Sequence, residues 1–272
     1  IGTETLGSVI SPATRCRVVG LRPTFGRISR HGAMALSWTM DKVGVLGRSP
    51  EDAALVLTAL AGSDSRDPAA VDRPLSYRTR RDFKGLKVGL VGEGTSEGGG
   101  QITVAVQLLR NLGAKIVPIA VTPVPEAVTE VLTVEAAAAF DELTRSGAVD
   151  TMKGSLWPPE FRSAMYVTGV DYIQAMRART LAMRKFEQEL GDVDIVLSQD
   201  RRANLLITTN LTGHPQVYLP LGTDAAAKPI GLSLWGRLYG EGTLLEVAQL
   251  LLERFEVPRN RPDLTKLENV KS

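Results

Sequence analysis

Near its start the chain contains a serine that directly follows a glycine, in a spacing that can support acyl-transfer chemistry. The segment reads Gly-Thr-Glu-Thr-Leu-Gly-Ser from Gly2 to Ser8. Consecutive backbone N–H groups in such a turn can converge on one point, which suits the oxyanion that forms when a hydroxyl attacks a carbonyl. On spacing alone, an ordinary Gly/Ser turn is the favoured interpretation of these residues. The hydroxyl would also need a base in contact with it.

The two histidines and the single cysteine give little support for other chemistries. His214 lies in a Gly-His-Pro turn and His31 in another predicted loop, and no Gly-x-Ser-x-Gly elbow accompanies them. We therefore interpret His31, His214 and Cys16 as structural. These residues form no ligand cluster, so we expect neither a metal nor a cofactor.

A glycine-rich segment at 92–100 lies between a predicted strand and a predicted helix, where a phosphate-binding loop would lie. Its spacing matches no dinucleotide fingerprint, and no Gly-Lys-Ser/Thr follows it. Two glutamates within it would repel phosphate. The segment therefore predicts a surface loop rather than a nucleotide site.

The segment around Ser8 resembles the nucleophile motif of the amidase signature family, which reads Gly-Thr-Asp-Thr-Gly-Gly-Ser-Ile-Arg-x-Pro-Ala. Further blocks resemble the motifs that follow in that family, in the same order along nearly the whole chain. These blocks are residues 16–29, 41–44, 48–54, 210–215 and 229–237.

The resemblance implies a Ser–cis-Ser–Lys triad, in which a neutral Lys deprotonates the nucleophile through a bridging Ser. A Lys can act as a base only if burial or a neighbouring charge lowers its pKa. By this resemblance Ser8 is the acylated nucleophile, and the backbone N–H groups of Thr5, Leu6, Gly7 and Ser8 form the oxyanion hole.

The Lys and the bridging Ser of the family lie upstream of this motif, and neither is present in this chain. Lys42 and Lys87 do not sit in matching contexts. We therefore expect that the chain by itself does not hydrolyse amides.

Two residues depart from the motif. Leu6 replaces its first Gly, so we expect strain or a different turn if that position needs a positive φ. Ile10 replaces an Arg that meets a substrate carboxylate in the tRNA-dependent amidotransferases of the family. An aliphatic side chain cannot form that bidentate pair. We therefore expect Ile10 to line a pocket for an uncharged or apolar acyl group.

Two further residues have more than one interpretation. Trp38 either lines the same substrate pocket or is a core aromatic. Asp41 resembles a position that either organises the loops near the site or takes part in the chemistry.

The elements that must position these residues follow an α/β pattern. Residues 1–50 predict loops and short extended pieces, one of them a strand at 17–21. Ser-Pro-Glu-Asp at 49–52 predicts the start of a helix that continues over 53–61. A strand–helix–strand unit typical of parallel sheets is predicted at 87–91, 102–112 and 114–119. Later helices are predicted within 126–190, the longest at 170–190, and at 204–211 and 241–255, and later strands at 194–197, 217–219 and 230–235.

The resemblance implies an amidase-signature α/β/α layered fold with a central mixed sheet whose N-terminal part is missing from this chain. Residues 1–258 would form the C-terminal portion of a single amidase domain, and 259–272 a polar tail. The opening Ile-Gly-Thr in place of Met fits this expectation of a fragment. A chain without the missing part would expose apolar surface, so a homodimer that covers this surface is a hypothesis.

Composition limits the classes of partner. The 272 residues are 43% hydrophobic and 23% charged, with a net charge of +2, which is ordinary for a soluble globular protein. The densest basic stretch, 77–81, falls in a predicted loop, so we expect no nucleic acid partner. No stretch approaches the roughly 20 apolar residues that span a membrane. A single cysteine fits a reducing compartment, with the cytoplasm as the default location.

The sequence therefore favours an amidohydrolase that cleaves a non-peptide carbon–nitrogen bond of a small-molecule amide. One alternative is the A subunit of a tRNA-dependent amidotransferase, against which Ile10 and the absence of a basic stripe argue. The other alternative is a non-catalytic, amidase-like binding module.

Overall fold

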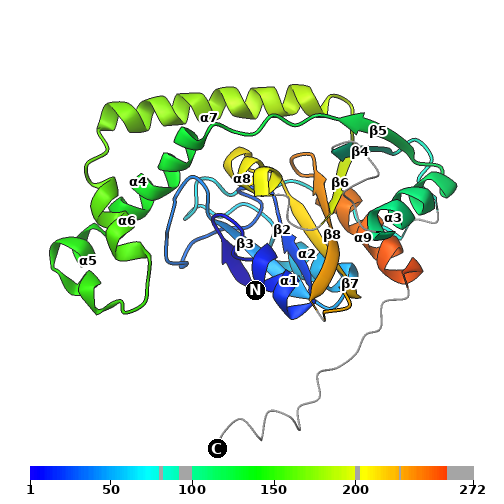
Figure 1. Ribbon diagram of the computed structural model, residues 1–272, viewed down its shortest axis with the longest axis horizontal. Coiled ribbons are helices and arrows are strands. Elements are labelled where there is room, and N and C mark those ends of the chain that lie inside the picture. The colour runs from blue at the N-terminus through cyan, green and yellow to red at the C-terminus, as the bar shows by residue number, and fades with distance from the viewer. Residues whose placement is uncertain (80–81, 92–99, 200–202, 227, 256–272) are drawn as a thin grey trace, which may run out of the picture.

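The computed structural model describes residues 1–79, 82–91, 100–199, 203–226 and 228–255. Strands of the described chain form an eight-stranded sheet in the order β1-β3-β2-β7-β8-β6-β4-β5 (Figure 1). Only β4 pairs in parallel, with β5 and β6, and the other pairings are antiparallel. The mixed sheet that the sequence predicts is confirmed. The strands are β1 Gly2–Glu4, β2 Val19–Arg22, β3 Lys42–Gly47, β4 Lys87–Val91, β5 Lys115–Ile119, β6 Ile195–Gln199, β7 Gln216–Thr223 and β8 Pro229–Gly236.

Helices cover both faces of this sheet. One face packs against α2 (Pro50–Leu60), α3 (Gly100–Asn111) and α9 (Glu241–Arg254), which share one apolar cluster with alternate residues of the strands. The opposite face packs against α1 (Ile10–Cys16), α8 (Ala203–Thr212) and the end of α7 (Gly169–Leu190). The arrangement is the three-layered α/β/α fold that we expected.

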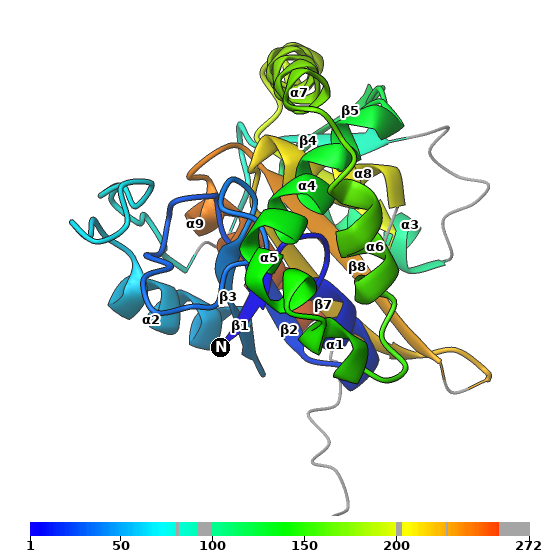
Figure 2. The ribbon, with the colours of Figure 1, turned by 90° about the vertical axis from the view of Figure 1, so that its left-hand side faces the viewer.

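A helical lobe extends beyond the sheet (Figures 1 and 2). It contains α4 (Glu130–Ala139), α5 (Asp141–Arg145) and α6 (Trp157–Ala164), with 3₁₀ turns at Glu126–Thr129 and Ala148–Thr151. The 22-residue α7 runs from this lobe back to the sheet. An apolar cluster of Met40, Val131, Ala175 and Leu211 joins the lobe to the layers that carry the turn around Ser8.

The first fifty residues contain more regular structure than we predicted. The prediction of loops and short extended pieces is wrong for helix α1, and it did not place the strands β1, at the edge of the sheet, and β3. From α2 onward the predicted elements match the observed ones within a few residues. The helix α2 begins with a capping box between Ser49 and Asp52. Most of the glycine-rich segment 92–100, and the predicted tail 259–272, lie outside the described residues.

Candidate active site

Ser8 lies exposed in the turn that joins the edge strand β1 to helix α1. The preceding Gly7 has a φ of 106°, a conformation that side chains disfavour. A Cβ at Gly7 would also lie 3.1 Å from the Leu206 side chain. Leu6 is not strained in this way, because Arg17 and Tyr239 are the only described non-glycine residues with positive φ.

The N–H groups of this turn are free of regular pairing. In the described part of the chain, those of Leu6, Gly7 and Ser8 donate no hydrogen bond, and these residues belong to neither strand nor helix. Unpaired donors near the hydroxyl are one of the conditions for an oxyanion hole. Within the same described ranges, no basic side chain hydrogen-bonds to the Ser8 hydroxyl.

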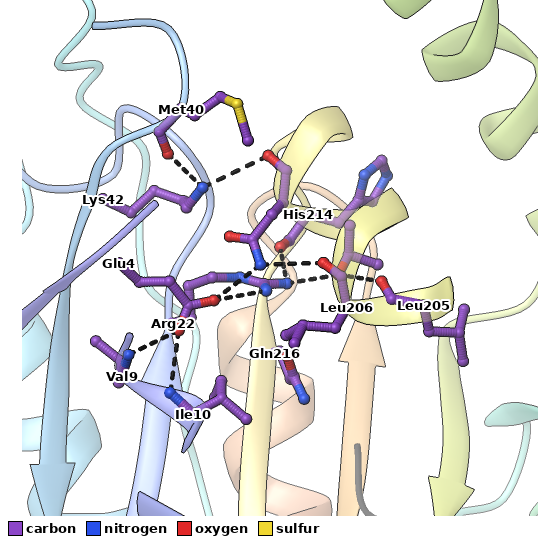
Figure 3. A network of polar contacts seen from close by, with 12 residues as sticks. Glu4, Val9, Ile10, Arg22, Met40, Lys42, Leu205, Leu206, His214 and Gln216 are labelled. Carbon is purple, nitrogen blue, oxygen red and sulfur yellow. Dashed lines mark hydrogen bonds and ion pairs between the residues drawn. The ribbon is translucent and has the colours of Figure 1, made fainter. Parts of the chain in front are cut away.

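A buried carboxylate holds both ends of the turn (Figure 3). Glu4, the last residue of β1, accepts the N–H of Val9 at 2.9 Å and that of Ile10 at 3.0 Å through Oε2. These two N–H groups lie at the start of α1, where the helix itself supplies no acceptor for them and negative charge is favoured. The side chain of Glu4 therefore closes a ring that contains Ser8.

The other oxygen of Glu4 ties the turn to the far end of the chain. Oε1 accepts from Arg22 Nη1 at 3.0 Å and from Asn210 Nδ2 at 2.9 Å. Arg22 also donates to the Thr209 hydroxyl and to the His214 carbonyl, each at 2.8 Å (Figure 3). Burial alone would raise the pKa of Glu4, but the charges of Arg22 and Lys42 and the Ile10 N–H lower it, so this carboxylate is ionised.

Lys42 is buried directly beside this network. Its Nζ donates to the Met40 carbonyl and, at 3.5 Å, to the Asn210 carbonyl. Burial and the neighbouring charge of Arg22 hold the pKa of Lys42 well below its usual range. No hydrogen bond joins Lys42 to Ser8 within the residues that the structure describes, and we assign it no catalytic role.

Thr5 is held from the opposite side of the turn. Its hydroxyl donates to Asp41 Oδ1 at 2.5 Å, and Asp41 Oδ2 accepts the N–H groups of Leu36 and Ser37 at 2.8 and 2.9 Å. Of the two interpretations of Asp41, these contacts favour the one in which it organises the loop beside the site. Turn and loop are thereby fixed to each other.

The two residues predicted to line a substrate pocket lie in different surroundings. Ile10 is fully buried and packs with Ala13 and Tyr218, so it has no exposed surface that could line a pocket. Trp38 is 51% exposed and lines a pocket of about 600 Å³ together with Asp41 and Lys42. Ser8 is not among the residues that line this pocket.

His214 has a structural environment. Its ring is buried, with Nδ1 2.8 Å from the Thr212 hydroxyl and Nε2 2.8 Å from Glu187. Cys16 is a free thiol on the surface. Among the described residues, no group of three His, Cys, Asp or Glu side chains could hold a metal ion. None of the described helices is both long enough and apolar enough to cross a membrane.

Sequence reasoning missed the part played by Glu4, Arg22 and Asn210. The available signal was chemical, because a carboxylate three residues before a glycine turn and an Arg within an apolar strand both need partners when they are buried. Nothing in the sequence indicated which residues would meet, since the contacts of Arg22 reach as far as Thr209, 187 residues later.

The model of the family described as Amidase matches residues 1–199. Curated relatives include the A subunit of glutamyl-tRNA(Gln) amidotransferase from Synechococcus sp. (strain CC9311), which is 29% identical over 97% of this chain and 65% of its own length. The protein of the same name from Geobacter metallireducens is 31% identical over 91% of this chain and 62% of its own. The chain thus spans a little under two thirds of the length of these relatives.

Solved structures share the fold. The peptide amidase of Stenotrophomonas maltophilia superposes with a TM-score of 0.75 and 26% identity, over 96% of this chain and 62% of its own. The A subunit of glutamyl-tRNA(Gln) amidotransferase from Thermotoga maritima superposes with a TM-score of 0.69 over 93% of this chain and 61% of its own. At 24% identity, the second is a likeness of fold alone.

Proposed function

Because the chain belongs to the amidase family, whose signature motifs it carries, we propose that it is the nucleophile-bearing part of an amidohydrolase for a carbon–nitrogen bond of a small-molecule amide. Ser8 would attack the amide carbonyl, and the N–H groups of the turn would receive the charge of the tetrahedral intermediate. The observation that carries the proposal is the exposed Ser8 in a turn with unpaired N–H donors that buried groups hold at both ends.

The restrained turn supports a role for its N–H groups in stabilising the tetrahedral intermediate. A donor that is already aimed costs no reorganisation when charge develops, and removing one typically lowers the rate about 10²–10³-fold. Glu4 and Asp41 restrain the turn before any substrate binds. The bond between the carbonyl carbon and nitrogen would then break as the nitrogen takes a proton, leaving an acyl group on Ser8 for water to remove.

This chemistry also needs a base, and we assign that role to no residue of this chain. We therefore expect a fluorophosphonate probe to label Ser8 slowly in the isolated chain, since an unactivated serine hydroxyl is a poor nucleophile. A small amine base added at increasing concentration should accelerate labelling, because it can replace the missing proton acceptor. Mass spectrometry of the labelled peptide would locate the adduct.

Matched variants separate the nucleophile from background reaction. Ser8→Ala should abolish the amine-dependent adduct, whereas Ser63→Ala, at another exposed serine, should leave it unchanged. Equal labelling of several serines would remove Ser8 from the proposed role and would favour the non-catalytic binding module. Rapid labelling without amine would contradict only the expectation that the chain is inactive alone.

A specific observation also favours the second candidate, the A subunit of a tRNA-dependent amidotransferase. The relatives from Synechococcus and Geobacter carry that name. The sequence argument against it loses force, because Ile10 is aliphatic in a position that is fully buried. Binding of tRNA, tested by gel shift against an unrelated RNA, would favour the amidotransferase. Turnover of simple amides without tRNA binding, once a base is supplied, would favour the hydrolase.

A further inference from the structure

The pocket that Trp38 lines, called here the Trp38 pocket, has the size of a small-molecule site. Its volume is about 600 Å³, within the range of roughly 300–1,000 Å³ that ligand pockets occupy. Much of its wall is apolar, contributed by Phe25, Ala33, Met34, Ala35, Pro68 and Ala69. It therefore offers contact area to an apolar group rather than a set of polar subsites.

The backbone that carries Trp38 is held on both sides, although the side chain itself is half exposed. On one side, the Ser37 hydroxyl donates to the buried Glu135 at 2.5 Å, and on the other the Thr39 N–H donates to the same carboxylate at 3.0 Å. Arg30 donates to the Trp38 carbonyl itself. An indole has only two side-chain torsions, so on a backbone that is already held it loses little entropy when a ligand stacks on it, which is why such residues serve as anchors.

The Arg, Lys and Asp side chains in the wall already have partners. Arg30 pairs with Asp67 at 2.8 Å, and Arg66 pairs with Asp64 at 2.9 Å. Asp41 accepts three hydrogen bonds, from Thr5, Leu36 and Ser37, and Lys42 donates to two carbonyls. A charged ligand would have to compete with these pairings, whereas a neutral one would not.

We propose that the Trp38 pocket binds a neutral aromatic group of a small molecule by stacking against the exposed indole. This site is distinct from the turn that carries Ser8, to which it is joined through the Asp41–Thr5 hydrogen bond. The binding does not require that Ser8 be a nucleophile.

Three ligands of one shape test the proposal: benzamide, benzoate and benzamidine, which are neutral, negative and positive at pH 7.5. Titrations followed by protein NMR should give a dissociation constant for benzamide on the order of 1 mM, as expected for so small a ligand. Benzoate and benzamidinium should bind at least about tenfold more weakly. Equal or tighter binding of either ion, or no saturable binding of benzamide, would overturn the proposal.

Variants locate the binding. Trp38→Ala should weaken benzamide binding at least about tenfold and Trp38→Phe much less, because the ring is kept. Trp157→Phe, at a partly buried Trp in the lobe, is the matched control and should bind like the wild type, with circular dichroism confirming that all variants fold. Unchanged binding in Trp38→Ala would overturn the proposal, as would a wild-type dimer that only Trp38→Ala dissociates, since a second copy would then fill the pocket.

Ser8→Ala separates this result from the proposed hydrolase. It should bind benzamide like the wild type, whatever the outcome of the labelling experiment. Loss of binding in Ser8→Ala would place the ligand at the Ser8 turn and would refute a separate Trp38 pocket.

Discussion

Glu4 and Arg22 are a buried ion pair on which the geometry of the Ser8 turn depends. Both side chains are fully buried, and the carboxylate accepts four hydrogen bonds. Removing one partner of such a pair typically costs about 3–5 kcal/mol, because the other charge stays buried without compensation. The intact pair therefore adds little net attraction to the folded state, but removing one partner strongly lowers the free energy of unfolding.

The first prediction follows for Glu4→Gln. We expect this change to lower the free energy of unfolding by about 3 kcal/mol or more, because it leaves Arg22 charged and buried. Urea denaturation followed by circular dichroism would measure it. Glu51→Gln, an exposed residue in the first turn of α2, is the control and should cost less than about 1 kcal/mol. Equal losses of unfolding free energy in the two variants would show that the buried ion pair matters no more for stability than an exposed glutamate.

Lys42 predicts a dependence of stability on alkaline pH. Its pKa in the folded protein lies well below the usual range through burial first and the charge of Arg22 second, while Glu4, Arg179 and Asp41 also face it. In the unfolded chain the pKa of a Lys is about 10.4. Between the folded and unfolded values, the unfolded chain binds more protons, so this group makes stability rise with pH.

The second prediction compares how the free energy of unfolding changes with pH in the wild type and in two variants. From pH 8 to 10, the free energy of unfolding of the wild type should rise relative to that of Lys42→Met, because the substitution removes the titrating group. Lys153→Met, at an exposed position, is the control and should follow the wild type. Parallel curves for wild type and Lys42→Met would mean that Lys42 titrates alike in both states.

At the scale of single residues, the sequence predicted the Ser8 motif but not the side chains that hold the turn in place. The Ser8 turn could be found because its residues are consecutive. The roles of Glu4 and Asp41 depend on partners at 9, 10, 22 and 210 or at 36 and 37, which only folding brings together. Ile10 illustrates the limit, since a buried Ile and one that lines a pocket look the same in sequence.

Among the elements, α1 decides where Ser8 lies, and its close packing on β2 depends on Gly20. A Cβ at Gly20 would lie 2.6 Å from the Cβ of Ala13, closer than two carbon atoms can approach. Helix and strand would have to separate. Because α1 begins two residues after Ser8, the turn would move with it.

The third prediction is that Gly20→Ala destabilises the protein by about 1–3 kcal/mol, the usual cost of overpacking, and slows amine-dependent labelling of Ser8. The control is Gly169→Ala in the first turn of α7, where a Cβ would meet nothing within 4 Å. That change should be neutral or stabilising, because Ala favours helix. Thermal unfolding and the labelling rate would measure both. A loss in Gly169→Ala equal to that in Gly20→Ala would contradict this account.

Elements with long periodic patterns or clear end signals were predictable, such as α2 with its capping box and β4 with its apolar run. The elements that position the site were not. Helix α1 has seven residues and contains Pro12, too short for a helical period to show. Strand β3 includes Gly44 and Gly47, and glycine weakens a strand signal. Tertiary packing, rather than local preference, determines both.

At the scale of the whole molecule, apolar side chains are exposed at the junction of α6 and α7. Tyr166, Val170 and Ile173 are each more than half exposed. Exposed apolar patches often mark sites of association. We therefore expect two copies to associate through this junction, which gives the homodimer hypothesis a defined surface.

The fourth prediction is that light scattering shows a mass that rises with concentration towards that of a dimer. The double change Tyr166→Ser with Ile173→Ser should return the monomer mass, because it removes apolar contact area. Leu55→Ser, an equally exposed apolar position on α2, is the control and should leave association unchanged. A clean monomer at every concentration would refute the prediction.

The span of the Arg22 contacts has a consequence for synthesis on the ribosome. Its partners Thr209 and His214 come 187 and 192 residues later, and at about 5–20 residues per second they emerge roughly ten to forty seconds after it. Until then β2 lacks its neighbour β7, and of the partners that Arg22 has in the structure Glu4 is present but Thr209 and His214 are not. The nascent chain must therefore keep its first strands from pairing wrongly throughout that interval, so a holding chaperone should raise the yield of folded protein more than a faster ribosome would.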